Sequence, residues 1–243
     1  KMTIYWMLNN HWPSFFGHLF DYYLCPGGAY YGAKKGLRPL SVVFDSYATG
    51  DHSRANVVVV NQSPDEQRDL RVRVRTYDLA GRVRDDRSTD AVSVPSGGSL
   101  RALTLPRLAP DSRVFFVRCE LPDADGNVIT ANTYWQSQRN DDVGSPANDQ
   151  AFDLRQTSWA DMTPLNTMAR VPLRVTAERS AGPDGTTVVI RLHNPTRQIG
   201  FFERAEVMAT HDGDEILPIE YSDNYVTVYP GETVGLTGAI TET

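Results

Sequence analysis

Residues 70–77 read Leu-Arg-Val-Arg-Val-Arg-Thr-Tyr, and this stretch decides the fold class. Its even-numbered positions are apolar or Thr, whereas positions 71, 73 and 75 are all arginine. A period of two is the pattern of a β-strand with one face buried and the other in water. The three arginines indicate a solvated strand face. A surface that binds a charged polymer is the alternative, but such a stripe repels a cationic polymer.

Other short apolar or alternating runs lie on both sides of this strand. They occupy residues 41–47, 55–60, 100–105, 114–121 and 128–135, with residues 70–79 as the central run. Turn-forming residues separate them, for example Ala80-Gly81-Arg82 and Ser96-Gly97-Gly98. Strands that recur about every ten residues, without helical stretches between them, are typical of an immunoglobulin-like β-sandwich. The sequence predicts one such domain over residues 39–137.

A second series of strands follows a polar segment. Residues 138–150 are rich in Asn, Asp, Gly, Ser and Pro and are predicted to be a linker. A short irregular or helical stretch is expected at 159–166. Predicted strands then cover 171–178, 187–192, 205–210, 225–228 and 232–237, with a hairpin turn at Pro183-Asp184-Gly185. Residues 151–243 are therefore predicted to form a second immunoglobulin-like β-sandwich, which makes the chain mainly β.

The beginning of the chain has a different texture. Residues 3–8 predict a short apolar strand, and residues 9–13 predict its polar and aromatic end. A helix is expected over 27–37, opening after Pro26-Gly27-Gly28 and stopping at Gly36. A single strand–loop–helix unit cannot stand alone, because a parallel strand needs neighbours on both sides.

Composition narrows the functional classes. The 243 residues are 40% hydrophobic and 22% charged, as in folded soluble domains. A net charge of −6 argues against nucleic acid as a partner, because phosphate binding needs a basic footprint. No apolar run approaches the ~18 residues of a membrane span. Cys25 and Cys119 are expected to be two separate small apolar side chains, and the cellular compartment stays undetermined.

No cofactor and no metal site are predicted. Residues 123–127, Asp-Ala-Asp-Gly-Asn, have the look of a calcium loop, but the bidentate Glu expected further on is absent, so a hairpin turn is favoured. The five histidines include no His-Glu-x-x-His spacing, and no Cys-x-x-Cys occurs. No glycine-rich phosphate loop is present.

Several longer motifs resemble one enzyme family. They are YWMLNNHWPSFFGHLFDYYLCPGGAYYGAKK at 5–35, ADMTPLN at 160–166, HNPTRQIGFFERAEV at 193–207 and SDNYVTVYPGE at 222–232. Together they resemble glycoside hydrolase family two, most closely the bacterial exo-β-D-glucosaminidases and more loosely the β-mannosidases. The resemblance covers both ends of the chain in the right order, and only the middle sandwich is weakly marked.

The resemblance implies that residues 1–38 are the last strand and helix of a catalytic TIM barrel. A retaining glycosidase uses two carboxylates about 5 Å apart. In the resembled family both lie on earlier barrel strands, and no Asp or Glu of this chain takes either position. The resemblance therefore assigns no catalytic residue here, and the chain alone is expected to be inactive.

Part of a substrate cleft is nevertheless expected, because barrel active sites lie at the carboxyl ends of the strands. By resemblance, Trp6 matches the final-strand tryptophan that lines the sugar site, and Asn10 stands where relatives carry Asn or Asp. Trp12 follows at the same strand end. An aromatic ring and an amide suit a pyranose, whereas simple barrel packing is the alternative for both tryptophans. The Asn9-Asn10 pair favours a glucosaminidase over a mannosidase.

Two functional interpretations follow. In the first, the parent enzyme releases glucosamine from the non-reducing end of chitosan oligosaccharides with net retention, or is a related β-mannosidase. Secretion of that parent rests on the resemblance alone. In the second, the chain is a non-catalytic β-sandwich module that binds carbohydrate or protein.

The aromatic residues of 1–38 are expected to pack on the first sandwich, to pair between chains, or to meet another polypeptide that supplies the barrel. The resemblance also suggests one more strand after Pro230-Gly231-Glu232 and leaves open whether it is missing here.

Overall fold

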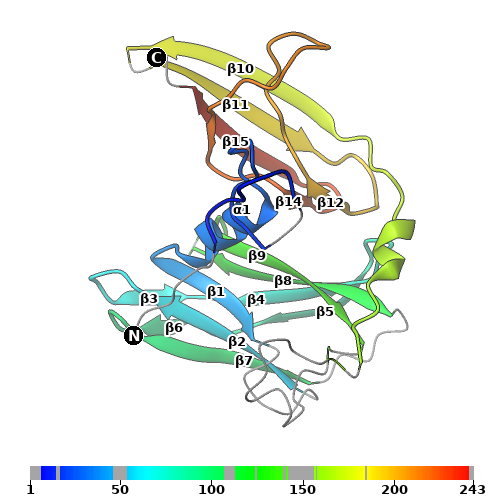
Figure 1. The fold of residues 1–243 in the computed structure, drawn as a ribbon. Coiled ribbons are helices and arrows are strands. Elements are labelled where there is room, and N and C mark those ends of the chain that lie inside the picture. The colour runs from blue at the N-terminus through cyan, green and yellow to red at the C-terminus, as the bar shows by residue number, and fades with distance from the viewer. Residues whose placement is uncertain are drawn as a thin grey trace. The chain divides into compact units, whose positions relative to one another are not determined.

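The computed structural model describes residues 7–14, 17–45, 54–106, 113–123, 125–138, 141, 156, 158–183 and 185–240. Strands dominate these residues (Figure 1). The chain divides into two compact units. The middle unit is Arg38–Ala169, and the composite unit combines Lys1–Leu37 with Arg170–Thr243. The chain is thus mainly β, as predicted.

The middle unit is a β-sandwich. One sheet has the order β1-β2-β7, the other has the order β5-β4-β8-β9, and β3 pairs with β6. The bounds are β1 Leu40–Asp45, β2 Arg54–Asn61, β3 Gln67–Leu70, β4 Arg73–Tyr77, β5 Val83–Ser88, β6 Val92–Val94, β7 Ser99–Pro106, β8 Val114–Pro122 and β9 Val128–Ser137. All of these sheet pairings are antiparallel.

Alternating side chains of both sheets build the core of this sandwich. Val57 and Val59 of β2 share one buried cluster with Val74 of β4 and Val117 of β8. The period-two pattern of the sequence is therefore confirmed. The strand predicted from residue 70 begins only at Arg73, because Asp69 has φ of 55° and the chain turns between β3 and β4. The edge strand β5 was not predicted, because its charged, exposed residues carry no apolar alternation.

The composite unit contains a second strand arrangement, with a sheet of order β10-β11-β15-β13 and the pair β12-β14. The bounds are β10 Arg174–Gly182, β11 Gly185–His193, β12 Gly200–Glu203, β13 Glu220–Tyr221, β14 Val226–Val228 and β15 Thr233–Ile240. The predicted strand at 205–210 is wrong. Only an isolated bridge between Met208 and Glu215 forms there. The short strands β12 and β13 were not predicted.

The strand β15 directly follows the turn at residues 230–232 and lies between β11 and β13. It corresponds to the strand predicted at 232–237. The additional closing strand that the resemblance suggests stays a prediction.

The predicted helix is observed as α1, Gly28–Gly36. Its Tyr31 is 3% exposed and belongs to the core of the composite unit, together with Ile190 of β11 and Leu236 of β15. The Lys34 ammonium donates a hydrogen bond to the Tyr221 carbonyl at 2.8 Å. The N-terminal segment therefore packs on the second strand series, which was not among the expected arrangements, and its contacts with the first sandwich or with another polypeptide stay predictions.

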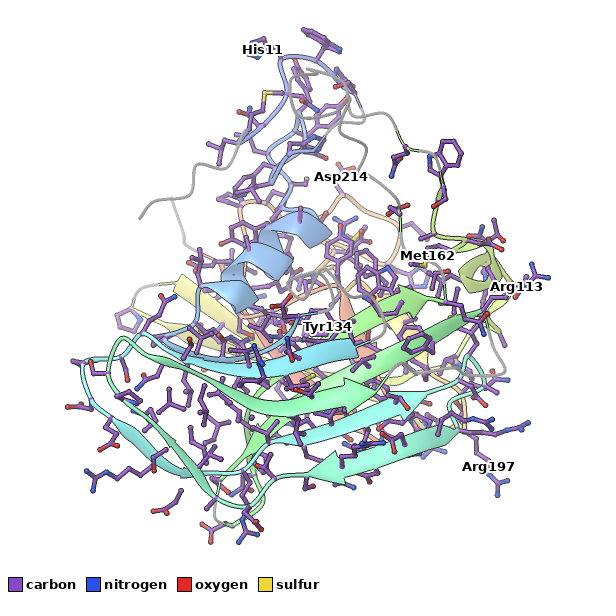
Figure 2. The ribbon with its side chains drawn as sticks, turned by 90° about the horizontal axis from the view of Figure 1, so that it is seen from below. His11, Arg113, Tyr134, Met162, Arg197 and Asp214 are labelled. Carbon is purple, nitrogen blue, oxygen red and sulfur yellow. The ribbon has the colours of Figure 1, made fainter. Side chains whose placement is uncertain are left out.

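The chain between the two strand series contains the short helical stretch that was expected near 159–166. Residues 163–167 form the short 3-10 helix η2 (Thr163–Thr167). The Ala160 N–H donates to Asp141 Oδ1 at 2.9 Å, and Arg113 lies 3.4 Å from Asp161. Figure 2 shows Arg113 beside Met162 at this end of the middle unit. The described residues up to 169 therefore belong to the middle unit, and the start of the second sandwich at 151 stays a prediction. Most of the predicted linker, 138–150, lies outside the described residues.

Two further expectations concerned membrane-spanning segments and the cysteines. Within the described ranges, no helix is long and apolar enough to cross a bilayer. Cys25 is partly exposed and Cys119 is buried, and both are free thiols.

Candidate functional site

Residues 7–14 and 17–27 belong to a loop that closes on itself before α1 begins. The Leu8 carbonyl accepts hydrogen bonds from the N–H groups of Leu19 and Phe20, at 3.2 and 2.9 Å. The Gly27 N–H donates to the Leu19 carbonyl at 3.0 Å. Figure 2 shows His11 at the tip of this loop. This loop carries two of the residues that the sequence predicted for the site, Asn10 and Trp12.

Asn10 is 5% exposed and is engaged within the loop. Its Nδ2 donates to the Ser14 carbonyl at 3.2 Å and lies 2.9 Å from His18 Nδ1. Because Nδ2 is a donor, His18 Nδ1 accepts and the imidazole proton is assigned to Nε2. Sequence reasoning pointed to Asn10 but missed Ser14 and His18, because no spacing rule links an amide to residues four and eight positions later.

Trp12 has the opposite environment. Its side chain is 64% exposed, and its ring meets the His11 ring edge to face at a centroid distance of 6.0 Å. A flat indole with an exposed face can stack on the C–H face of a sugar or pack against another apolar surface. Trp6, the third predicted substrate-binding residue, lies outside the described residues.

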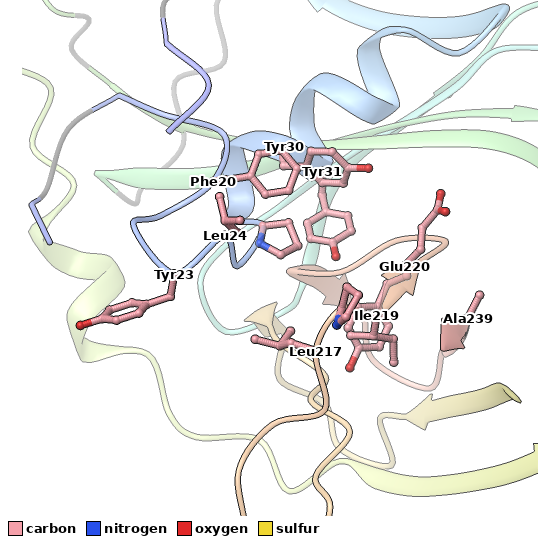
Figure 3. Close-up of a pocket in the computed structure, with 12 residues that line it drawn as sticks. Phe20, Tyr23, Leu24, Tyr30, Tyr31, Leu217, Ile219, Glu220 and Ala239 are labelled. Carbon is pink, nitrogen blue, oxygen red and sulfur yellow. The ribbon is translucent and has the colours of Figure 1, made fainter. Parts of the chain in front are cut away.

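A cavity of about 630 Å³ opens within the composite unit (Figure 3). Residues of the N-terminal loop and α1 form one wall, and residues around β13 and β15 form the other. The lining residues are Phe20, Tyr23, Leu24, Pro26, Tyr30, Tyr31, Leu217, Pro218, Ile219, Glu220, Tyr221 and Ala239. Aromatic and aliphatic groups dominate this lining, and Tyr23 and Leu24 at its rim are 67% and 64% exposed. Sequence reasoning missed the wall at 217–221, which has no motif.

The ionisable side chains that line this cavity do not form an acid–base pair. Glu220 is the single acidic residue among the described lining residues, and its carboxylate lies 3.8 Å from the Lys34 ammonium. Burial raises the pKa of the Tyr31 and Tyr221 hydroxyls, so both stay neutral at physiological pH. The cavity therefore offers apolar burial, and its lining has no pair of carboxylates of the kind that a retaining glycosidase needs.

Other sequence candidates resolve into structural roles. Asp123 Oδ1 accepts the backbone N–H groups of Asp125 and Asn127 at 2.9 and 2.8 Å, which confirms the predicted hairpin turn between β8 and β9. Among the residues that the structure describes, no group of three or more His, Cys, Asp or Glu side chains could hold a metal ion.

Arg73 and Arg75 of the predicted arginine stripe lie on β4 and are paired with carboxylates. Arg73 makes two hydrogen bonds to Asp86, at 2.9 and 2.6 Å. Arg75 lies 2.6 Å from Glu120, and the Arg75 side chain is only 22% exposed. The interpretation as a solvated face is therefore confirmed for Arg73 and wrong for Arg75.

Two known families match consecutive parts of the sequence. Residues 53–138 match the family described as a mannosidase Ig/CBM-like domain. Residues 151–243 match the family described as the exo-β-D-glucosaminidase Ig-fold domain.

Longer relatives match almost the whole chain. An exo-β-D-glucosaminidase of Streptomyces avermitilis is 38% identical over 97% of this chain and 26% of its own length. The enzyme of the same name from Amycolatopsis orientalis is 33% identical over 96% of this chain and 22% of its own length. The chain thus spans about a quarter of the length of these curated relatives.

Solved structures of similar proteins superimpose on almost the whole chain. An Amycolatopsis orientalis exo-chitosanase, in complex with PNP-β-D-glucosamine, superimposes with a TM-score of 0.87 at 31% identity, over 98% of this chain and 28% of that chain. A β-D-mannosidase from Dictyoglomus thermophilum shares the fold, with a TM-score of 0.61 at 14% identity, over 98% of this chain and 24% of that chain. Over nearly its whole length, the chain is therefore related to the C-terminal part of the exo-β-D-glucosaminidases of glycoside hydrolase family two.

Proposed function

We propose that this chain is the non-catalytic C-terminal part of a retaining, exo-acting β-D-glucosaminidase. The parent enzyme hydrolyses β-linked amino-sugar oligosaccharides, such as those of chitosan. The names of the long relatives support this reaction, and the matches of the two Ig-like domains support the place of the chain in the enzyme. In this proposal the described residues contribute support and cleft wall, and the reactive carboxylates come from the catalytic part.

One observation carries the proposal. The N-terminal segment is anchored through Tyr31 in the composite unit, yet its loop presents large apolar side chains to water. Their exposed fractions are 61% for Leu8, 64% for Trp12, 45% for Tyr22, 67% for Tyr23 and 64% for Leu24. Several large, exposed apolar side chains on one loop are typical of a surface that another polypeptide covers. We infer that residues 1–38 complete the catalytic barrel and that the barrel covers this loop and the cavity beside it.

The proposed roles of the three site residues differ. Trp12, whose indole is exposed, stacks on the substrate at the cleft rim. Asn10 shapes the loop through Ser14 and His18, and its remaining amide oxygen faces the sugar. The role proposed for Trp6, from the resemblance alone, is to line the sugar site.

Reconstitution tests the proposal. The chain alone should release no chromophore from p-nitrophenyl β-D-glucosaminide, because general acid–base catalysis and the nucleophile are both absent. The separately expressed catalytic part of the same enzyme should bind the chain when the two are mixed. The mixture should then hydrolyse the substrate. In that mixture, Trp12→Ala should lower kcat/KM about tenfold through lost stacking. Trp159→Ala is the control, because Trp159 is equally exposed, at 66%, but lies in the middle unit.

Turnover by the chain alone would contradict the proposal that it carries no catalytic residue. Failure of the chain to bind the catalytic part would contradict the assignment of residues 1–38 to the barrel.

A β-mannosidase is the second candidate, because residues 53–138 match a mannosidase domain. Preferential turnover of p-nitrophenyl β-D-mannoside by the reconstituted enzyme would favour it.

The third candidate is a separate binding module. Calorimetry of the chain with glucosamine oligomers distinguishes it, because micromolar binding without the catalytic part supports a module. Self-association through residues 1–38 would appear as a dimer that Trp12→Ala or Tyr23→Ser dissociates.

A further inference from the structure

The strand β10 is an open edge of the composite unit. It ends the order β10-β11-β15-β13, and in the described part of the chain no strand pairs with its outer side. All nine residues of Arg174–Gly182 are exposed. Figure 1 shows β10 as a long strand along the margin of its sheet. By contrast, β13 at the opposite edge is only the dipeptide Glu220–Tyr221.

This edge lacks most features that block pairing. The register with β11 runs without a shift from Arg174↔His193 to Gly182↔Gly185, so no bulge twists the strand away. The strand contains no proline. A regular edge of this length presents a row of N–H and C=O groups that can template another strand.

The two faces of β10 are chemically distinct. Val175 and Ala177 pair with the buried Leu192 and Ile190, so they lie on the inner, apolar face of the sheet. The alternate residues Arg174, Thr176 and Glu178 lie on the outer face. Val175 is nevertheless 59% exposed, because the apolar face of the sheet continues to its edge without cover.

We propose that β10 pairs with β10 of a second copy of this chain, antiparallel and across a two-fold axis at Thr176. This register sets Arg174 opposite Glu178 of the other copy, twice. It sets Val175 opposite Ala177 of the other copy and Thr176 opposite Thr176 of the other copy. Opposite charges and apolar pairs directly across a strand pair are favourable.

Several registers would join the two sheets into one continuous sheet with both apolar faces on the same side. The charges of the facing side chains distinguish among these registers. An axis at Glu178 brings two carboxylates together. An axis at Ala177 sets Val175 opposite Arg179 and leaves Thr176 opposite Glu178. Only the axis at Thr176 matches opposite charges, so the second copy is the complementary partner.

The proposed pairing is short and weak. It covers Arg174–Glu178 of each chain, and its next step would set Arg179 opposite Leu173, which precedes the strand. Glu178 already contacts Arg191 of its own chain at 2.7 Å, and its second carboxylate oxygen remains for Arg174 of the other copy. So small an interface belongs to the weak, reversible class. We therefore expect a concentration-dependent dimer that salt dissociates.

Sedimentation velocity of the whole chain over a concentration series tests the pairing. Arg174→Glu places two Glu–Glu pairs in the register, and Glu178→Arg places two Arg–Arg pairs. Each variant alone should dimerise at least about tenfold more weakly than the unmodified chain. An equimolar mixture of the two should recover the dimer, because the mixed pair restores opposite charges at both positions.

Thr176→Lys adds a second test, because it brings two ammonium groups together at the axis. Its control is Thr187→Lys, which adds the same charge at an exposed position of the neighbouring β11 and should leave the dimer unchanged. A chain that is monomeric at every concentration would overturn the proposal. So would a dimer that survives both Arg174→Glu and Thr176→Lys. Neither result bears on the glucosaminidase proposal, which is tested by reconstitution.

Discussion

At the scale of single residues, the carboxylate of Glu120 binds two arginines. Glu120 is 4% exposed and lies 2.6 Å from Arg75 and 2.9 Å from Arg118. A buried charge is tolerated only when it is paired, because transfer out of water costs several kcal/mol. The sequence shows these three charges but not their proximity, since Arg75 and Glu120 are brought together by the pairing of β4 with β8.

Removal of this carboxylate should be costly. Glu120→Ala leaves two largely buried guanidinium groups without their shared partner, so the free energy of unfolding of the middle unit should fall by about 3 kcal/mol. The matched control is Asp86→Ala, which breaks the more exposed pair with Arg73 and should cost less than about 1 kcal/mol. Urea unfolding followed by intrinsic fluorescence measures both. Equal losses in the two variants would contradict the assigned difference in burial.

A second residue, Glu203, gives the composite unit a pH dependence. Partial burial raises the pKa of the Glu203 carboxyl above its usual 4.5. The protonated form is therefore favoured by folding. Its contribution to stability is complete below the unfolded pKa and is lost as pH rises through the raised folded pKa.

Glu203→Gln should thus stabilise the composite unit more at pH 7 than at pH 4. The gain at pH 7 should stay below about 1 kcal/mol, because the side chain is partly solvated. Thermal unfolding of both proteins at the two pH values provides the measurement. A gain that is equal at both pH values would show that the carboxylate charge is not its cause.

At the scale of elements, the two strand series use the same turn. Asn61 at the end of β2 and Asn194 after β11 are both fully buried. Asn61 Nδ2 donates to the Val94 carbonyl at 3.0 Å, and Asn194 Nδ2 donates to the Val228 carbonyl at 2.8 Å. In each turn the amide oxygen accepts the backbone N–H of the Ser or Thr two positions later. An Asn-x-Ser/Thr step after an apolar strand thus closes each sandwich by local side-chain bonds.

Loss of this amide should open the turn. Asn194→Ala removes the bonds to the carbonyls of residues 198 and 228 and to Thr196. We expect a loss of about 3 kcal/mol, because buried backbone groups stay unpaired. Thr196→Val keeps its backbone N–H bond to Asn194 and should cost about 1 kcal/mol. Hydrogen exchange of β12 and β14 reports the opening directly. Unchanged protection of both strands in Asn194→Ala would contradict this role.

At the scale of the whole molecule, a helix from one end of the sequence completes the core built by the other end. The Tyr31 ring lies 6.0 Å from that of Tyr225, and Lys35 lies 3.0 Å from Asp223. Gly28 allows close approach at the start of the helix, because a Cβ there would lie 2.5 Å from the ring of Phe202. The N-terminal segment is therefore an integral part of the composite unit.

Tyr31→Ala should release this segment. Truncating a buried aromatic side chain costs about 3–5 kcal/mol, and here the loss falls on the docking of α1. Limited proteolysis should then cut within residues 7–37 faster than in the unmodified chain. Tyr22→Ala, at a site that is 45% exposed, should leave the cleavage rate unchanged. Resistance of the segment in Tyr31→Ala would show that other contacts hold it.

Much of this organisation could be predicted from sequence. Alternation located β2, β7, β8 and β9, and the Pro-Gly-Gly step located α1, because these signals are local. The strands β5, β12 and β13 could not be predicted. β5 is charged and exposed, whereas β12 and β13 are too short to show a period. For the site, the sequence proposed Trp6, Asn10 and Trp12 but not the partners of Asn10 or the cavity wall at 217–221.

The sequence by itself determined the β class, the two strand series, the N-terminal helix and the resemblance to the exo-β-D-glucosaminidases. Each of these depends on neighbours within about ten residues or on motifs read along the chain. Only the tertiary structure decided that Tyr31 enters the core of the C-terminal strands, that Glu120 joins two arginines and that β10 is left as an open edge. These depend on residues far apart in sequence, and their proximity is set by burial of apolar surface and by strand register, which no local pattern encodes.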